Sequence, residues 1–209
     1  MLVQPWDAGT AEEGLELARA HGFGQLVAAG RGRDVPVVVP TQFVVEHGAD
    51  GTEILLHLAR ANPVWAAIEE NSLVVLSVAG DWAYVPAAWK AVDDEDPAWG
   101  IPTTYYAAAQ LTGTARVVVD PEGKAEILRR QIAREETDGG ASMVDPAEHG
   151  RRLAGILGLR IRVEQVVAKF KYGGNADAAH RARVAELLAR RAGPGDAVAR
   201  RRLLERAPD

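Results

Sequence analysis

The stretch TEILLHLARANPVW, residues 52–65, runs from an apolar strand pattern directly into the start of a helix. Apolar residues dominate positions 52–58, which predicts a strand. Asn62 is of a residue type that caps helix N-termini, and Pro63 follows it in the position that proline prefers at a helix start. The stretch therefore predicts a strand over 52–58, a tight corner, and a short helix over 62–71.

The polar residues of this corner, HLARANPVW at 57–65, allow two interpretations. Arg60 can make bidentate contacts to a phosphate, His57 can donate a ring hydrogen bond, and the helix start after Asn62 presents free backbone N–H groups. A plain strand-to-helix corner would use the same residue types for its own backbone. The corner taken alone leaves both the structural role and an anion site open.

The rest of the chain alternates strands with short helices in the same way. Further strands are predicted over 24–29, 35–45, 73–79, 83–85, 105–120 and 159–172, and helices over 8–22, 121–136, 146–157 and 175–191. Turn-forming segments, GRGRD at 30–34 and HGADG at 47–51, join the early strands, so no crossover helix separates them. Six or seven antiparallel strands favour a small closed barrel over a βαβ sheet.

Composition describes an ordinary globular chain of 209 residues with 47% apolar and 25% charged residues. No apolar run approaches the ~20 residues that span a bilayer. The start, MLVQPWDAGTAEEG, has neither the basic nor the apolar region of a signal peptide, and there is no cysteine. We therefore expect a cytoplasmic protein with no membrane contact and no thiolate chemistry.

Several chemistries are disfavoured by missing patterns. The five histidines are scattered without metal-ligand spacing, so we expect no metal site. GRGRD lacks the phosphate-loop pattern, and no GxGxxG occurs. Only three serines are present, and none sits in a nucleophile elbow, which makes serine hydrolysis improbable.

The C-terminal segment is basic although the net charge is −5. Eight arginines lie between 180 and 206. A solvated helix face with a frayed end is the favoured interpretation, and a phosphate contact is the alternative. The acidic total and the lack of a recognisable helix-turn-helix argue against direct DNA binding. We divide the chain at residue 175, with 176–209 as a C-terminal helix and basic tail.

Two more segments combine basic and aromatic residues. AYVPAAWK at 83–90 places Tyr84, Trp89 and Lys90 around a proline, and AKFKYGGN at 168–175 places Lys169 and Lys171 on one face of the last strand. Between them, residues 86–104 read as a long loop with an acidic cluster at 93–96, and such loops are often functional. Three basic and aromatic corners in one small barrel favour a planar anionic cofactor.

These segments also carry a resemblance. HLARANPVW, AYVPAAW, IPTTYY at 101–106 and KFKYGGN occur in the order and spacing of the PaiB-like family of FMN-binding split β-barrel proteins, often labelled FMN-binding negative transcriptional regulators. The resemblance covers roughly residues 1–190. The first motif matches almost completely, whereas Lys90 replaces a tyrosine of the family pattern, Thr104 and Tyr105 replace Trp-Asn, and 172–174 replace Leu-Ser-Gln.

The resemblance implies a mainly β, α+β fold, a six-stranded antiparallel split β-barrel of FMN-binding type over 1–175 with a C-terminal helix. It also implies a homodimer with FMN in clefts between the subunits. The residues that it assigns to cofactor binding are His57, Arg60, Ala61, Asn62, Tyr84, Trp89, Thr103, Lys169 and Lys171. No catalytic residue is assigned.

Three functions remain open from the sequence. The first is a flavoprotein, either a flavin-dependent oxidoreductase or a redox sensor, in which the flavin carries the chemistry. The second is a negative transcriptional regulator, acting indirectly if DNA is not bound. The third is a split-barrel dimer that has lost the flavin or exchanged it for a deazaflavin or another ligand, and acts as an interaction protein.

Overall fold

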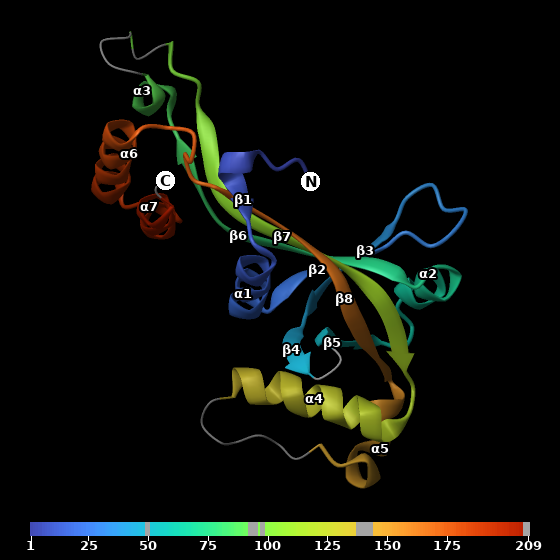
Figure 1. The fold of residues 1–209 in the computed structure, drawn as a ribbon. Coiled ribbons are helices and arrows are strands. Elements are labelled where there is room, and N and C mark those ends of the chain that lie inside the picture. Colours follow the sequence, from blue (N-terminus) through green and yellow to red (C-terminus); the bar gives the residue numbers. More distant parts are fainter. Residues whose placement is uncertain (49–50, 92–95, 97–98, 137–143, 207–209) are drawn as a thin grey trace. The chain divides into compact units, whose positions relative to one another are not determined.

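The computed structural model describes residues 1–209 except 49–50, 92–95, 97–98, 137–143 and 207–209 (Figure 1). Most of the predicted acidic cluster at 93–96 thus lies outside the described residues. The chain forms two compact units, unit 1 with 1–14, 79–109 and 167–209, and unit 2 with 15–78 and 110–166. Three of the four boundaries fall inside long strands, β6 (Leu73–Val85), β7 (Thr103–Val118) and β8 (Ile156–Lys171), and the fourth falls inside the first helix. Each unit is described by itself.

Unit 2 is an antiparallel sheet. Its shorter strands are β2 (Phe23–Ala28), β3 (Val37–Gln42), β4 (Val44–Gly48) and β5 (Gly51–Ala59). Together with the long strands they follow the order β3-β2-β6-β7-β8-β5-β4. The register places Val27 opposite Val38 and Leu56 opposite Leu159.

The sheet curls because its two edge strands are neighbours in the sequence. β3 and β4 stand at opposite ends of the strand order, yet only Phe43 separates them, so the edges must approach each other. Phe43 is fully buried, as are Leu26, Leu76 and Leu111. Alternating side chains of the strands thus fill the inside of a curled sheet, as the closed-barrel prediction requires.

β5 is apolar on both faces because a helix covers its outer side. Ile54, Leu55 and Leu56 are all buried, and Leu55 packs with Val118 and with Ile127 of α4 (Pro121–Glu135). The predicted run at 52–58 therefore lacks the strict alternation of a strand with one face in water.

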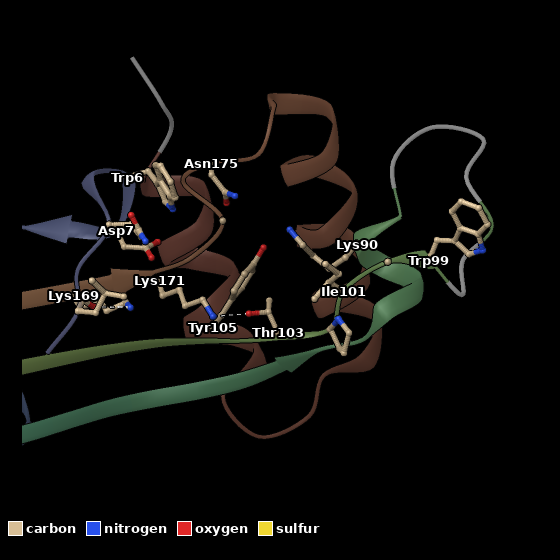
Figure 2. Close-up of a pocket in the computed structure, with 15 residues that line it drawn as sticks. Trp6, Asp7, Lys90, Trp99, Ile101, Thr103, Tyr105, Lys169, Lys171 and Asn175 are labelled. Carbon is tan, nitrogen blue, oxygen red and sulfur yellow. Dashed lines mark hydrogen bonds between the residues drawn. The ribbon is translucent and has the colours of Figure 1, made fainter.

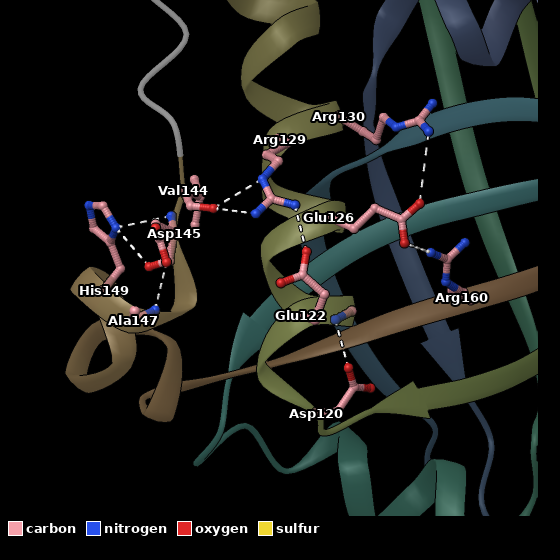
Figure 3. Close-up of polar contacts among 11 residues, drawn as sticks. Asp120, Glu122, Glu126, Arg129, Arg130, Val144, Asp145, Ala147, His149 and Arg160 are labelled. Carbon is pink, nitrogen blue, oxygen red and sulfur yellow. Dashed lines mark hydrogen bonds and ion pairs between the residues drawn. The ribbon is translucent and has the colours of Figure 1, made fainter.

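Polar contacts fix α4 and the following α5 (Pro146–Ala154), as Figure 3 shows. Asp120 and Asp145 accept backbone N–H groups at the two helix starts and so act as their N-caps. Arg160 of β8, mostly buried, donates to Glu126 of α4 at 2.7 Å and to Glu53 of β5 at 3.1 Å. The remaining helix of unit 2 is α2 (Val64–Glu70), shorter than the predicted 62–71.

Unit 1 holds the ends of the long strands and the C-terminal helices. Its elements are η1 (Pro5–Asp7), β1 (Ala8–Gly9), α3 (Ala87–Lys90), α6 (Ala178–Arg191) and α7 (Asp196–Glu205), while α1 (Ala11–His21) begins in it. β1 pairs with β8, with Ala8 opposite Lys169. At the start of α1, Thr10 and Glu13 form the reciprocal contacts of a capping box.

The basic C-terminal segment is folded, and several of its arginines bind unit 1 itself. Buried Arg181 donates to the carbonyl oxygens of Gly173 and Leu203, and Arg191 pairs with buried Asp196 at 2.5 Å. Arg206 donates to Glu13 at 2.6 Å. The expected frayed end is therefore wrong up to residue 206, whereas Arg190, Arg200 and Arg201 lie exposed on helices, as a solvated helix face requires.

The α+β class is confirmed, but the number of strands is not the six that were expected. The described residues contain an eight-stranded sheet. Two causes account for the difference: the buried Phe43 divides the predicted strand 35–45 into β3 and β4, and Ala8–Gly9 adds the short β1. The predicted strands 73–79 and 83–85 are one strand, β6.

Among the described residues, no helix is long and apolar enough to cross a membrane.

Candidate functional site

The predicted site residues fall into two groups. His57, Arg60, Ala61 and Asn62 belong to unit 2, whereas Tyr84, Trp89, Thr103, Lys169 and Lys171 belong to unit 1. Each group is described within its own unit.

In unit 2, His57 is held by a buried glutamine. Its Nδ1 lies 2.6 Å from Oε1 of Gln131 on α4, and Nε2 of Gln131 donates to the carbonyl of Gln42 at 3.3 Å. Because the amide oxygen of Gln131 can only accept, the bond assigns the proton of His57 to Nδ1. The contact orients the imidazole and leaves Nε2 as its second polar atom.

Arg60 caps the C-terminal end of α5. Its Nε donates to the carbonyl of Ala154 at 2.7 Å, and its backbone N–H donates to Gly155 at 2.9 Å. Buried Lys124 donates to the neighbouring carbonyl of Leu153 at 2.6 Å. Burial, and then the positive charge of Arg60, lowers the pKa of Lys124. Two cations thus satisfy carbonyls at the negative end of a helix, which stabilises it.

The rest of the corner also serves the backbone. Oδ1 of Asn62 accepts the N–H of Val64 at 3.0 Å, and the indole of Trp65 donates to the carbonyl of Ala59 at 2.9 Å. Ala61 lies exposed in the same turn. The structural interpretation of HLARANPVW is confirmed by these contacts. The exposed guanidinium of Arg60 is the cationic group of the corner that a phosphate could still reach.

In unit 1, a cavity of about 570 Å³ brings three of the four sequence segments together (Figure 2). Its lining consists of Leu2, Gln4, Trp6, Asp7, Lys90, Trp99, Gly100, Ile101, Pro102, Thr103, Tyr105, Lys169, Lys171, Gly173 and Asn175. The volume lies within the ~300–1,000 Å³ typical of ligand and cofactor sites.

Three lysines give the cavity its charge. The Lys171 ammonium donates to Oγ1 of Thr103 at 2.7 Å (Figure 2). Lys169 donates to the carbonyl of Leu2 at 3.0 Å and lies 5.7 Å from the centre of the Tyr106 ring. Lys90 has no hydrogen-bond acceptor within the described part of the chain. Burial, and next the charge of Lys171, lowers the pKa of Lys90.

Asp7 is the one carboxyl group among the lining residues. It is buried, and burial raises its pKa against the opposing effects of Lys169, Lys171 and Arg206. One carboxyl group facing three ammonium groups leaves the cavity with an excess of positive charge. Such a site favours an anionic ligand.

A buried phenol forms part of the cavity wall. Tyr105 is 1% exposed, and its hydroxyl has no hydrogen-bond partner among the described residues. Burial raises the pKa of Tyr105 to about 12. Gly173 has φ +70°, and a Cβ there would lie 2.5 Å from the Tyr105 oxygen, so only glycine lets the bend close over the phenol. Buried polar groups without a partner are rare and call for an explanation.

The rim of the cavity is apolar and open to water. Leu2, Trp6, Trp99 and Ile101 are all exposed, the last two by 76% and 80%. Large apolar side chains exposed around one polar cavity are typical of surfaces that bind another molecule.

Tyr84 and Trp89 lie away from this cavity lining. Tyr84 lines a second hollow of about 400 Å³, beside Trp82 and the turn at 193–196. The ring of Trp89 lies 4.7 Å from the guanidinium carbon of Arg191.

Twelve of the fifteen lining residues were absent from the predicted set, among them Trp6, Asp7, Lys90, Tyr105 and Asn175. Lys90, Tyr105 and Asn175 lie inside the sequence segments that were singled out, close to predicted site residues. Trp6 and Asp7 come from the N-terminal 3-10 turn, for which no pattern in the sequence gave a signal.

Comparison with known proteins agrees with this picture. Residues 2–165 match the family model described as "Putative FMN-binding domain". The protease synthase and sporulation protein PAI 2 of Bacillus subtilis (strain 168) is 25% identical over 168 residues, 79% of this chain and 77% of that protein.

Two solved structures show the same fold at low identity. The FAD and heme binding protein of Mycobacterium smegmatis matches with a TM-score of 0.60 at 22% identity, over 90% of this chain and 82% of that one. The flavocytochrome Anf3 of Azotobacter vinelandii matches with a TM-score of 0.59 at 19% identity, over 86% and 78%. The predicted split β-barrel class and the expected FMN family are confirmed. The chain therefore belongs to the PaiB-like family of FMN-binding domains.

Proposed function

We propose that this chain is a flavoprotein that binds FMN at the cavity of unit 1. The observation that carries the proposal is the meeting of three sequence segments at one cavity, where Lys90, 101–105 and 169–175 surround a common space. The family to which the chain belongs is described by FMN binding. The cavity is where the chain's own residues best fit such a ligand.

The residues present fit the chemical groups of a flavin. A flavin offers a planar apolar ring system, hydrogen-bond acceptors along one edge, and a phosphate. The cavity offers the indoles of Trp6 and Trp99, the donors of Lys169 and Lys171, and an excess of positive charge. Aromatic rings pack favourably on flat ligands, and ammonium groups bind oxyanions.

Bound FMN would supply the two-electron redox chemistry, and the protein would supply binding and electrostatics. Thr103 holds the ammonium of Lys171 at one end of the cavity, and Leu2 holds that of Lys169. Fixed positive charge beside a bound ring favours negative charge that develops on it. No pair of groups in the cavity is assigned as acid and base, so the proposal names no substrate.

A homodimer is part of the proposal. The exposed rim of Leu2, Trp6, Trp99 and Ile101 supports it, because a single copy leaves these side chains in water. In the proposed dimer the exposed guanidinium of Arg60 from a partner copy would complete the phosphate contacts. Size measurement by light scattering, with and without FMN, tests the assembly: a monomer in both conditions would remove it.

Regulation of transcription is proposed only as an indirect effect of ligand state. The PAI 2 relative carries a name from protease synthesis and sporulation. Against direct DNA contact stand the net charge of −5 and the internal contacts of Arg181, Arg191 and Arg206. A redox or ligand-sensing flavoprotein could act on transcription through another protein.

The test is a titration of the apoprotein with FMN, FAD and a deazaflavin, followed by flavin fluorescence. Lys171→Met should weaken FMN binding by roughly 10-fold or more, the loss of a charged hydrogen bond. Arg116→Met, an exposed cation at the end of β7 in unit 2, is the control and should change nothing. If none of the three ligands binds, the chain is an interaction protein that has kept the barrel without the flavin. If the deazaflavin binds more tightly than FMN, the deazaflavin becomes the proposed cofactor.

A further inference from the structure

The ammonium of Lys90 is the group of the cavity that flavin binding in general does not explain. This residue departs from the family pattern, which has a tyrosine at the position, and it lines the same cavity as Lys171 and Tyr105. We propose that Lys90 and Lys171, with the hydroxyl of Tyr105 beside them, form an oxyanion subsite. The ligand group is a phosphate or a carboxylate.

The backbone around Lys90 is held in place. Arg183 of α6 donates to the carbonyl of Trp89 at 3.3 Å and also to that of Ala91, so the residues on both sides of Lys90 are anchored. The side chain extends from this fixed base toward the cavity (Figure 2). The anchored backbone fixes the point from which the Lys90 side chain extends, so the backbone need not be ordered when a ligand binds.

The position is unfavourable for a lysine without a ligand. Lys90 is partly buried, and the charged group that most affects it is another cation, Lys171. His180 also faces it: burial lowers the pKa of this imidazole, and Lys90 and Arg183 lower it further. Burying a charge beside like charges costs free energy unless an anion compensates. No described side chain provides that anion to Lys90.

The other charges of the cavity are already compensated. Lys169 has its carbonyl partner and the face of Tyr106, and Asp7 interacts with Lys169, Lys171 and Arg206. Lys171 uses one of its three N–H groups for Thr103 and keeps donors for a ligand. The uncompensated charge is therefore that of Lys90, and Lys171 adds free N–H donors beside it.

Tyr105 is the independent sign of a missing acceptor. Its hydroxyl is shielded from water and unpartnered within the part of the chain that the structure describes, and in Figure 2 it points to the same part of the cavity as the Lys90 ammonium. Two ammonium groups and one hydroxyl are all donors, which is the arrangement that an oxyanion satisfies.

The oxyanion has two sources, the phosphate of FMN itself or a separate small anion bound next to the flavin. Calorimetric titration of the apoprotein with inorganic phosphate, FMN and riboflavin distinguishes them. Lys90→Met should weaken phosphate binding by about 10-fold or more, and Lys90→Arg should restore most of it. Arg116→Met removes an exposed cation of unit 2 that does not line the cavity, so its effect should stay below about 3-fold.

The outcomes separate cleanly. If Lys90→Met weakens FMN and phosphate alike and leaves riboflavin unchanged, the subsite holds the flavin's phosphate. If it weakens phosphate alone, the subsite holds a separate anion. Equal effects of Lys90→Met and Arg116→Met, or no saturable phosphate binding to the unmodified protein, would overturn the subsite. Phosphate binding without any flavin binding would overturn the proposed function and leave the subsite standing.

Discussion

Removing the hydroxyl of Tyr105 should stabilise the ligand-free protein. The Tyr105→Phe variant keeps the ring, which is 1% exposed and lies 6.0 Å from the ring of Tyr172 in an edge-on arrangement. It deletes one polar atom that no described residue satisfies. The change therefore removes a desolvation cost without removing an internal hydrogen bond.

The magnitude follows from that cost. An unsatisfied buried hydroxyl costs about 1–3 kcal/mol of stability. The small void left by the missing oxygen is itself destabilising and cancels part of what the variant gains. We expect the free energy of unfolding to rise by about 1–2 kcal/mol, which for a chain of this size corresponds to a Tm increase of roughly 2–8 °C. The affinity for phosphate should fall at the same time, because the hydroxyl is a proposed ligand donor.

Urea denaturation at pH 7, with thermal unfolding as a second readout, measures the change. Tyr106→Phe is the matched control, since Tyr106 is the next residue and only partly buried, and its effect should stay within about 0.5 kcal/mol. The pKa of Tyr105, raised to about 12, adds a pH dependence. Its neutral form stabilises the fold fully below the unfolded value of about 10, and that contribution is lost as the pH rises through 12. A loss of more than about 1 kcal/mol in Tyr105→Phe would refute the reasoning, because it would mean that the hydroxyl has a partner.

Three further variants test other parts of the account. Asp196→Asn should lower the free energy of unfolding by about 2–3 kcal/mol at pH 7. This is less than the loss of a fully buried ion pair would cost, because about a third of the Arg191 side chain is exposed. Arg191 lowers the pKa of Asp196, so this difference is present above about pH 4 and should shrink as the pH falls further; equal differences at pH 7 and pH 3 would contradict the assignment. Arg60→Met should reduce FMN affinity by about 1.5–3 kcal/mol and leave riboflavin unaffected in a fluorescence titration, whereas unchanged FMN affinity would restrict Arg60 to capping α5. Arg206→Gln should lower the free energy of unfolding in urea by about 1–2 kcal/mol, because the contact with Glu13 is lost. It should not change the migration of DNA in a gel-retardation assay. If the variant instead loses specific DNA retardation at unchanged stability, the basic segment binds phosphate.

Much of the fold could be predicted because local patterns and tertiary structure agree. The caps Asp120 and Asp145, the capping box of Thr10 and Glu13, and the strand leading to His57 are all readable from neighbouring residues. The break at Phe43 was not readable, because an apolar residue within an apolar run gives no signal that the chain passes from one sheet edge to the other.

The candidate site was predictable in part, for a similar reason. Thr103, Lys169 and Lys171 lie in segments with recognisable motifs, and the structure brings them to one cavity. Trp6 and Asp7 reach it only through the pairing of β1 with β8, a contact of residues far apart in the chain. A contact between residues that are so far apart in the chain produces no recognisable pattern in the local sequence.

Arg60 shows that one motif residue can serve two roles. Its motif matched the family almost completely, yet its Nε serves the end of α5, a helix more than eighty residues later in the chain. A residue type that suits an anion also suits the carbonyls of a helix end. Sequence spacing could not separate these two roles, and the contact geometry shows the second.

The central claim is that the chain holds a flavin, and the visible absorption spectrum of the purified protein tests it most directly. The account predicts flavin absorption bands, either as isolated or after incubation with FMN and removal of the excess, and mass identification of FMN in the material that heat releases. A colourless protein that retains no added FMN, FAD or deazaflavin would contradict it.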